Sequence, residues 1–278
     1  MPETEYTLSE LENIANKLRL HVVEMTYAAR SGHPGGSLSA ADMITALYFK
    51  FMKHDPQNPA WEDRDRFVLS KGHVAPILYA ALAESGYFPV EDLLTLRSIG
   101  SKLQGHPVRG KVPGVEMSTG SLGQGLSMAC GIALAGKMDG KDYKTICMLG
   151  DGELQEGQNW EAAMFARQAG LTNLIAIVDR NRLQITGDTE AAVGLEPLPE
   201  KWKAFGWNVI IIDGHNMRQN LEALDKAAAA KTRPTVIIMK TVKGKGVSFM
   251  ENNAGFHGKA CNDEEQQRAI AELQAVIQ

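Results

Sequence analysis

Four apolar runs in the second half of the chain restrict its fold more than any other feature. They cover residues 145–149, 174–179, 208–213 and 235–242, and stretches with helical character follow the first run and the third. Each run is apolar throughout rather than alternating, which is typical of strands in a parallel sheet that helices cover on both faces. The length of the chain suits one large core. We therefore predict a single α/β domain over residues 1–278 with a mostly parallel sheet.

The first half of the chain predicts helices around one further strand. Thr7 or Ser9 is a suitable cap for a long helix, and Ser39 for a second one, because hydroxyl side chains accept hydrogen bonds from free backbone N–H groups. A loop is expected over 100–125, where glycine is frequent. The other expected elements are a strand at 66–70 and helices at 7–30, 39–51, 74–85, 89–98, 122–138, 159–170, 217–230 and 262–278.

Composition argues against several classes of partner. The net charge of -4 gives no basic footprint for nucleic acid, and no run reaches the roughly 18 apolar residues of a membrane span. The polar N-terminal segment does not resemble a secretion signal. Cys130, Cys147 and Cys261 lack the spacing of a zinc site or a disulfide framework. We therefore expect a cytoplasmic protein that binds neither nucleic acid nor membrane.

The stretch LGDGELQEG places an acid between two glycines directly after an apolar run. Gly150 and Gly152 let the backbone turn sharply and approach a ligand closely. The helix expected to start near Gln155 or Glu156 directs N–H groups at this turn, which suits a phosphate. Asp151 is an oxygen ligand for a hard divalent cation. A diphosphate with Mg²⁺ fits all three features, although an Asp-Gly turn without any ligand explains the motif taken alone.

Asn181 follows the next apolar run, 30 residues after Asp151. This is about the length of one strand–helix–strand unit, so both side chains should emerge at the same edge of the sheet, from neighbouring strands. The pair resembles the thiamine diphosphate binding motif. That resemblance implies that Asp151, Asn181 and the backbone carbonyl of Leu183 hold Mg²⁺, with Ca²⁺ or Mn²⁺ as substitutes. The metal would bridge to the diphosphate of the cofactor.

Four motifs rich in glycine and histidine occur in the order that is seen in transketolases. They are SGHPGGSLSAAD, SKGHVAPILYA, GHPVRGKVPGVEMSTGSLGQG and GDGELQEGQNWEA. The resemblance runs from about residue 18 to about residue 257, yet a full transketolase is more than twice as long as this chain. The chain therefore resembles the N-terminal subunit of a split transketolase, with the thiamine-diphosphate-binding fold.

This resemblance implies a transferase of the pentose phosphate pathway type that uses thiamine diphosphate and Mg²⁺. It would move a two-carbon glycolaldehyde unit from a ketose phosphate to an aldose phosphate. In this family the glutamate that activates the aminopyrimidine of the cofactor belongs to the following domain, and nothing in this sequence supplies it. The implied partner is a C-terminal, pyrimidine-binding subunit in an α2β2 heterotetramer, and we expect the chain to be inactive alone.

The resemblance also assigns roles to individual histidines. His33, His106 and His257 would line the sugar channel, and His33 or His257 would move the proton of the donor's C3 hydroxyl. His73 and His257 would contact the diphosphate or nearby substrate hydroxyls. A single histidine is more simply a surface or core residue, but the position of these residues beside glycines in loops favours function.

Other implied contacts involve the rings of the cofactor and its activation. Gly120 and Leu122 match positions that touch the aminopyrimidine and the thiazolium. Ile185 would support the bent shape of the cofactor, although ordinary core packing explains it nearly as well. Glu156 would reach towards the activating glutamate of the partner, and Glu161 would lie near the same contact between subunits.

Three departures from the transketolase pattern leave the sugar open, and one of them is GGSLSAAD in place of a more common variant that contains proline and glycine. Ser121 and Val108 stand where transketolases usually have a proline in TGPLGQG and a glutamate after GHP. A split ketolase for an unusual sugar would look almost the same, and a non-catalytic binding subunit of the same fold is the alternative from another class. Deoxyxylulose-phosphate synthase shares the fold but lacks these motifs. GIALAGKM nearly matches a phosphate loop, but Met138 replaces its Ser or Thr, which argues against a nucleotide hydrolase.

Overall fold

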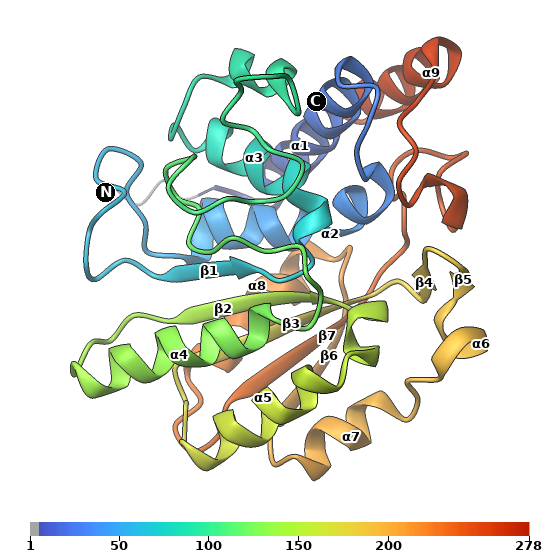
Figure 1. Ribbon diagram of the computed structural model, residues 1–278. Helices are drawn as coiled ribbons and strands as arrows, with labels where there is room; N and C mark the ends of the chain where they lie inside the picture. Colours follow the sequence, from blue (N-terminus) through green and yellow to red (C-terminus); the bar gives the residue numbers. More distant parts are fainter. Residues whose placement is uncertain (1–5, 278) are drawn as a thin grey trace.

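Five parallel strands form the central sheet of this computed structural model, which describes residues 6–277 (Figure 1). In chain order they are β1 (Arg66–Leu69), β2 (Thr145–Gly150), β3 (Leu174–Arg180), β6 (Asn208–Asp213) and β7 (Thr235–Lys240). Within the sheet their order is β1-β2-β3-β7-β6, and every pairing is parallel. The predicted α/β fold is therefore confirmed. Residues 1–5 and 278, which the single-domain prediction includes, lie outside the described residues.

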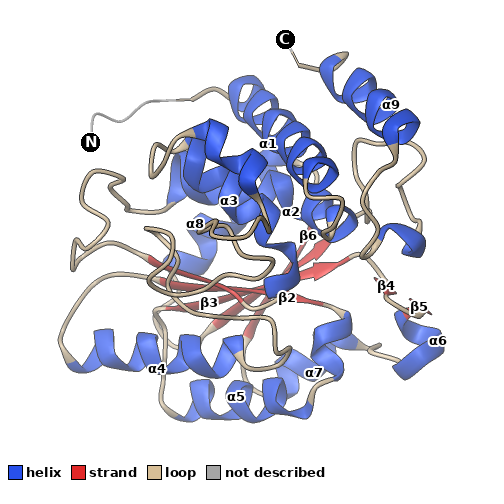
Figure 2. Ribbon diagram, turned by 45° about the horizontal axis from the view of Figure 1, so that its top comes forward, coloured by secondary structure: helices blue, strands red, loops and turns tan. Residues whose placement is uncertain are grey.

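Alternate side chains of each strand enter two apolar cores, one on each face of the sheet. On β2, Ile146 and Met148 belong to one core, and Cys147 and Leu149 belong to the other. Figures 1 and 2 show the helices in two layers on opposite sides of the strands. The first core lies under α1 (Leu8–Ala28), α2 (Pro34–Ala46), α3 (Ala75–Glu84) and α8 (Met217–Ala228), and the second under α4 (Gly125–Met138), α5 (Gly157–Gln168) and α7 (Leu198–Ala204).

Reciprocal capping fixes where the first and last helices begin. The Thr7 hydroxyl accepts a hydrogen bond from the N–H of Glu10 at 3.3 Å, and the Glu10 carboxylate accepts one from the N–H of Thr7 at 2.7 Å. Thr7, rather than Ser9, is therefore the cap of α1. Asn262 and Glu265 form the same arrangement at α9 (Asp263–Gln274), which packs along α1.

The second helix begins earlier than Ser39, where the sequence predicted its cap. It starts at Pro34, because the fixed φ of proline suits the first helical turn, and it runs into the π-helical turn η1 (Leu47–Phe51). Ser39 is buried within the helix, and its hydroxyl donates to the carboxylate of Asp179 at 2.6 Å. The Ser39 hydroxyl, which was expected to cap a helix, therefore hydrogen-bonds to a residue near the end of β3 instead.

Short elements account for the remaining differences from the sequence prediction. The predicted helix at 89–98 is the 3₁₀ helix η3 (Val90–Thr95), and further 3₁₀ turns are η2 (Gly72–Val74), η4 (Gly152–Gln155) and η5 (Ala254–Phe256). The sequence did not predict β4 (Leu183–Gln184), β5 (Gly187–Asp188), α6 (Thr189–Val193) or α7, because each is too short to show a periodic pattern. Within residues 6–277, no helix combines the length and the apolar character that crossing a membrane requires.

Two glycines of α4 offer a matched test of how closely this helix packs against the sheet. A Cβ at Gly125 would meet the Cα of Ser70 at 2.7 Å, whereas one at Gly131 would meet nothing within 4 Å among the described residues. Gly125→Ala should lower the free energy of unfolding by about 1–3 kcal/mol through overpacking. Gly131→Ala should raise it by about 0.5–1 kcal/mol, because alanine favours a helix. Urea denaturation measures both variants, and equal effects would contradict this packing.

Candidate active site

A cavity of about 180 Å³ lies at the carboxyl ends of the parallel strands, where ligands bind in sheets of this kind. The sequence-predicted site residues that line it are His73, Leu122, Gly150, Asp151, Gly152, Asn181, Leu183, Ile185 and His257. The other lining residues, to which the sequence assigned no individual site role, are Gly36, Lys71, Glu153, Gln155, Gln184 and Lys243. Lys71, Glu153 and Lys243 lie two or three residues after strand ends, and this position was the available signal for them.

Four predicted site residues lie outside the wall of this cavity. His33 and His106 stand beside it, in the histidine cluster described below. Gly120 has a φ of 137° and packs against the ring of His106, which an added Cβ would meet at 2.7 Å. Glu156 is exposed at the N-terminal end of α5, next to Gly123. The roles assigned to these four residues stay predictions, as do the roles assigned to the residues that line the cavity.

Asp151 lies at the turn after β2 and is only 2% exposed. Its Oδ1 accepts a hydrogen bond from the N–H of Gly152 at 2.8 Å, and its Oδ2 accepts one from the N–H of Arg182 at 2.5 Å. The Arg180 guanidinium donates to Oδ2 at 3.2 Å. Burial and the nearby carboxylate of Asp179 outweigh these donors and raise the pKa of Asp151. A carboxylate in such surroundings is stabilised by a cation.

Asn181 emerges beside this turn, as its spacing from Asp151 predicted. Strands β2 and β3 pair with Gly150 opposite Asp179, so the residues that follow leave the sheet at the same edge. Asn181 Oδ1 accepts a hydrogen bond from the N–H of Leu183 at 3.1 Å. The carbonyl of Leu183 accepts one from the ammonium group of Lys243 at 2.9 Å. Each of these oxygens has a second lone pair, so both remain able to coordinate a cation.

Asp179, near the end of β3, is a fully buried carboxylate that the sequence analysis did not single out. Lys71, which follows β1, forms an ion pair with it. Ser39 of α2 and Thr241, which follows β7, donate hydroxyl hydrogen bonds to it, and the Asn181 amide donates at 3.3 Å. Burial acts to raise the pKa of Asp179, but Lys71 and the other donors outweigh it and hold that pKa below its usual value. Three strand ends and one helix are thus fixed around a single negative charge.

Glu153 holds the glycine turn in place from the inside. Its side chain is buried and accepts hydrogen bonds from the N–H of Gly150 at 2.9 Å and from the N–H of Gly123 at 3.0 Å. The Ser70 hydroxyl donates to the same carboxylate. Burial raises the pKa of Glu153 above its usual value despite these donors. The segments after β1, before α4 and after β2 therefore converge on this one side chain.

Four histidines from distant parts of the chain face one another beside the cavity. The ring centroid of His33 lies 5.2, 6.2 and 5.5 Å from those of His73, His106 and His257, respectively. His73 and His257 stack with centroids 5.1 Å apart. The Nδ1 atom of His33 is buried without a hydrogen-bond partner among the described residues. The cluster therefore has unused hydrogen-bonding capacity close to the cavity.

Burial keeps these imidazoles neutral. It is the main reason why the pKa of His33 falls to about 4, and together with Lys243 it lowers the pKa of His257 to about 3. Burial also lowers the pKa values of His73 and His106. A neutral imidazole has one donor and one acceptor nitrogen, so the cluster can bind hydroxyl groups in either direction and can take up a proton.

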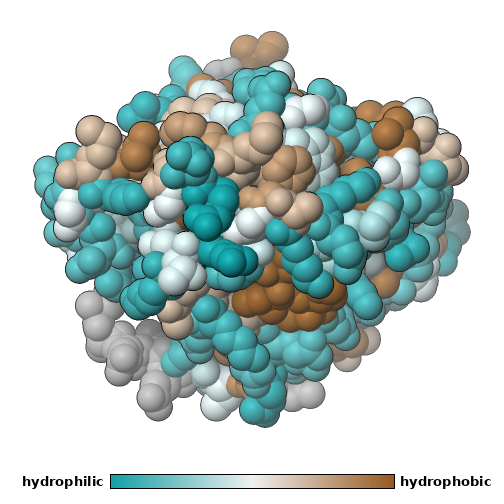
Figure 3. Space-filling model, turned by 90° about the horizontal axis from the view of Figure 1, so that it is seen from below, coloured by the Kyte–Doolittle hydropathy of each residue, from teal (hydrophilic) through white to brown (hydrophobic). Residues whose placement is uncertain are grey.

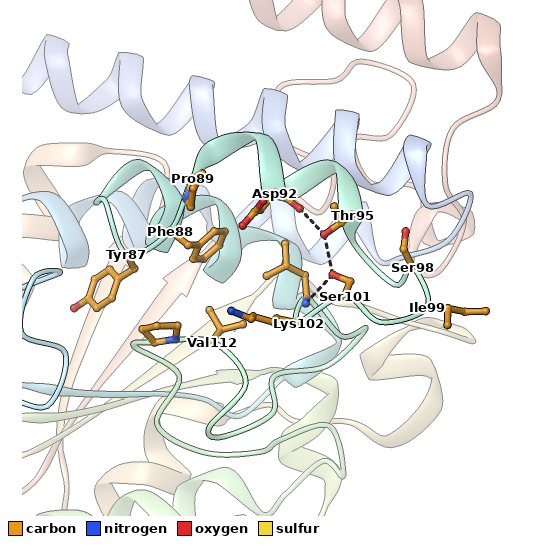
Figure 4. A pocket seen from close by; sticks show the side chains of 12 residues that line it. Tyr87, Phe88, Pro89, Asp92, Thr95, Ser98, Ile99, Ser101, Lys102 and Val112 are labelled. Carbon is orange, nitrogen blue, oxygen red and sulfur yellow. Dashed lines mark hydrogen bonds between the residues drawn. The ribbon is translucent and has the colours of Figure 1, made fainter.

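A larger cavity of about 480 Å³ lies elsewhere, at the 3₁₀ helix η3 (Figure 4). Its wall comes from residues 87–113, among which Asp92 and Lys102 are the charged lining residues. In Figure 4 the hydroxyls of Thr95 and Ser101 hydrogen-bond to each other at 2.8 Å, so these polar groups already have partners. Neither a strand end nor a histidine contributes to this wall. The smaller cavity at the sheet edge is therefore the better candidate for chemistry.

The oxygens around the smaller cavity fit a hard divalent cation that arrives with an anionic ligand. Within residues 6–277, no group of three His, Cys, Asp or Glu side chains is arranged to hold a metal by itself. Asp151, Asn181 and the carbonyl of Leu183 offer a carboxylate, an amide and a backbone oxygen, and Mg²⁺ commonly adds phosphate oxygens and water to such a set. Lys71 and Lys243 also line the cavity and add positive charge that suits a phosphate.

Comparison with known proteins finds relatives over nearly the whole chain. The family described as "Transketolase, thiamine diphosphate binding domain" matches residues 11–274. A 6-deoxy-6-sulfo-D-fructose transketolase subunit from Clostridium sp. (strain MSTE9) is 48% identical over 95% of this chain and 96% of that protein. An apulose-4-phosphate transketolase subunit from Phocaeicola vulgatus is 44% identical over 97% of this chain and 95% of that protein. The crystal structure of transketolase from Campylobacter jejuni superposes with a TM-score of 0.91 at 36% identity, over 97% of this chain and 43% of that longer one.

The contrast between two histidines tests the electrostatic description of the site. Burial lowers the pKa of His33 to about 4, whereas Glu24 and Glu84 outweigh burial and raise the pKa of His21. NMR titration of the ring signals should therefore show His21 protonated first as the pH falls, and His33 only near pH 4.

The same pKa shift links His33 to stability. When folded, His33 binds fewer protons than when unfolded, so its contribution to stability is complete above its unfolded pKa of about 6.5. That contribution is lost as the pH falls towards the folded value of about 4. If the NMR titration gave His33 a midpoint at or above that of His21, the description of His33 as part of a neutral cluster would be wrong.

Proposed function

We propose that this chain, which belongs to the transketolase family as a thiamine diphosphate binding domain, is the N-terminal, cofactor-binding subunit of a split transketolase. The observation that carries the proposal is the shared edge of β2 and β3, where Asp151 and Asn181 emerge beside a cluster of neutral histidines. Two relatives that match this chain over nearly their whole length are named as transketolase subunits. Their names support the proposal that this chain, too, is one part of a divided enzyme.

At the cofactor end of the site, Asp151, Asn181 and the carbonyl of Leu183 would hold Mg²⁺, which would neutralise the diphosphate of thiamine diphosphate. His73 and Lys243 line the same cavity and would face the anionic group. The carboxylate of Asp151 supplies the negative charge that a divalent cation needs, and the burial that raises its pKa is offset once the cation is in place.

The sugar end of the site uses the histidines. Bound thiamine diphosphate supplies a nucleophilic thiazolium carbon and a sink for electrons when the C2–C3 bond of a ketose breaks. His33, His106 and His257 bind the sugar hydroxyls, and His33 or His257 takes up the proton of the C3 hydroxyl. Their lowered pKa values mean that the rings are neutral at neutral pH, so each has an acceptor nitrogen for a sugar hydroxyl. The overall reaction moves a two-carbon glycolaldehyde unit from a ketose to an aldose.

The exposed rim of the cavity supports the proposal that a second subunit completes the site. At about 180 Å³ the cavity is smaller than the roughly 300–1,000 Å³ that is typical of sites for ligands of cofactor size. Leu122 and Ile185 line it but are 36% and 72% exposed, and Glu156 is exposed close by. Apolar side chains on a rim of this kind suit contact with another protein. We infer that a C-terminal, pyrimidine-binding subunit completes the site in an α2β2 assembly.

A further apolar surface lies on the face of the molecule that carries α4, α5 and α7. Figure 3 shows this side as mostly hydrophilic with several apolar areas. Met164 and Phe165 of α5 are 52% and 46% exposed. Because α5 begins directly after the glycine turn of the site, contact with a partner along this helix fits a cofactor held between subunits.

The two relatives named as subunits favour an unusual sugar over a common ketose phosphate. One is named for 6-deoxy-6-sulfo-D-fructose and the other for apulose 4-phosphate, so both names describe sugars with an anionic group. We therefore propose an anionic sugar outside the ordinary pentose phosphate set as the substrate, with a common ketose phosphate as the second candidate. The family match supports an enzyme subunit over a non-catalytic binding subunit.

Calorimetric titration with thiamine diphosphate and Mg²⁺ tests the proposed cofactor. Asp151→Asn removes the charged metal ligand and should weaken binding by about 100-fold or more, since changes that only touch a ligand already cost 10–100-fold. The matched control is Asp142→Asn, an exposed aspartate before the amino end of β2, which should keep the affinity of the unchanged chain. Equal affinity in the two variants would rule out Asp151 as a metal ligand.

A transfer assay tests the need for a partner and the choice of sugar. The purified chain should show no glycolaldehyde transfer by itself, because the cavity is incomplete at its rim. Transfer should appear when a pyrimidine-binding transketolase subunit is added, and it should be faster with sulfonated or branched anionic sugars than with common ketose phosphates. Full activity of the isolated chain would overturn the split-enzyme proposal, and a preference for common ketose phosphates would overturn the choice of sugar.

A further inference from the structure

Arg180 is a buried arginine at the end of β3 that neither the sequence motifs nor the proposed chemistry uses. Its side chain is 4% exposed. Nη1 donates to Asp151 Oδ2 at 3.2 Å and to the Thr189 hydroxyl at 2.7 Å. Nη2 donates to Glu190 Oε1 at 2.7 Å and to Glu196 Oε1 at 3.0 Å. One guanidinium group thus connects the proposed metal carboxylate to a segment that follows the β4–β5 hairpin.

The side chains of Arg180 and Gln155 connect this segment, residues 188–197, to the cavity. Arg180 reaches it from Asp151. Gln155, which lines the cavity, donates from Nε2 to the carbonyl of Val193 at 2.9 Å. Within the segment, the Glu190 carboxylate accepts a hydrogen bond from the N–H of Leu195 at 3.0 Å. The segment is therefore folded around the same acid that Arg180 contacts.

The charges around Arg180 are balanced. A guanidinium group 3.2 Å from a metal ligand would by itself repel a divalent cation. Glu190 and Glu196 provide two carboxylates on the other nitrogen, so the cluster keeps the orientation of the guanidinium group without a net positive charge. The fork of Arg fixes two acceptors in one plane, which the single ammonium group of Lys cannot do.

The hydrogen bond from Arg180 also makes the two carboxylate oxygens of Asp151 unequal. Oδ2 accepts hydrogen bonds from the Arg180 side chain and from the N–H of Arg182. Oδ1 accepts one hydrogen bond among the described residues, from the N–H of Gly152 at 2.8 Å. Oδ1 is therefore the oxygen with capacity left for a cation.

We propose that Arg180 is a positioning residue that couples the order of segment 188–197 to the binding of the divalent cation by Asp151. This inference rests on the proposed function, because it takes Asp151 as a metal ligand. Coupling between two sites is reciprocal. A cation at Asp151 therefore stabilises segment 188–197, and the loss of a contact within the segment weakens the binding of the cation.

Titration of the chain with Mg²⁺ at saturating thiamine diphosphate tests the effect on the metal. Arg180→Met should weaken Mg²⁺ binding by about 10-fold, as changes beside a metal ligand usually do, and Arg180→Lys should restore part of the loss. Arg218→Met, at an exposed arginine on α8, is the control for the change in net charge and should bind Mg²⁺ as the unchanged chain does. If Arg180 acted through its charge alone, its removal would tighten binding; tighter or unchanged binding by Arg180→Met overturns the inference.

Hydrogen–deuterium exchange provides a readout that does not depend on activity. In the unchanged chain, Mg²⁺ with thiamine diphosphate should slow the exchange of amides in segment 188–197, and Arg180→Met should remove this protection. Glu196→Gln serves if Arg180→Met does not fold, because its side chain is 41% exposed and the change leaves Asp151 untouched. It should show a smaller loss of Mg²⁺ affinity and of protection. A loss of thermal stability with unchanged affinity would show that the cluster is only structural.

Different results would overturn the proposed cofactor-binding function and the proposed coupling through Arg180. An unchanged chain that does not bind Mg²⁺ with thiamine diphosphate would overturn the proposed function. An unchanged chain that binds both, together with an Arg180→Met variant of equal affinity and equal protection, would overturn the coupling alone.

Discussion

The arrangement of the site depends on one buried ion pair, between Asp179 and Lys71. Both side chains are almost completely buried, and breaking such a pair from one side leaves an uncompensated charge that costs about 3–5 kcal/mol. The ends of β1, β3 and β7 are therefore held at fixed positions relative to one another. The same carboxylate accepts the amide hydrogen of Asn181, which leaves the amide oxygen available for a cation. Structural stability and the presentation of a metal ligand thus come from a single interaction.

Positive charge and neutral imidazoles divide the site into two regions. Lys71 and Lys243 stand at the strand ends, where an anionic group fits, and the histidines lie beside them, where burial keeps the rings uncharged. Lys243 joins the two regions, because its ammonium group lies 2.9 Å from Nδ1 of His257. Burial lowers the pKa of Lys243 to about 8, and Lys243 in turn lowers the pKa of His257. Anion binding and proton acceptance are therefore electrostatically coupled across one short contact.

The sequence predicted those features that local pattern determines. Apolar runs gave the strands, and the spacing between Asp151 and Asn181 gave their shared edge, because one strand–helix–strand unit has a nearly constant length. Pro34 was the local signal for the true start of α2. Ser39 was wrongly predicted as the cap of this helix, because its contact with Asp179, far away in the chain, leaves no local pattern. The contacts of Arg180 were missed for the same reason, since they join residues that no periodic pattern connects. Helix α7 shows no usable pattern at its length, although Trp202 anchors it in the core.

The exposed rim at Leu122 and Ile185 affects how such an enzyme is supplied in a cell. In the proposed assembly the site is complete only while two polypeptides remain associated, so dilution of the complex depletes active sites even when both chains are intact. The chain that is present in the smaller amount then limits the number of complete sites. Surplus copies of the cofactor-binding chain expose the apolar rim of the cavity to solvent. Because one chain alone leaves the cavity incomplete, the two chains must be synthesised in equal amounts.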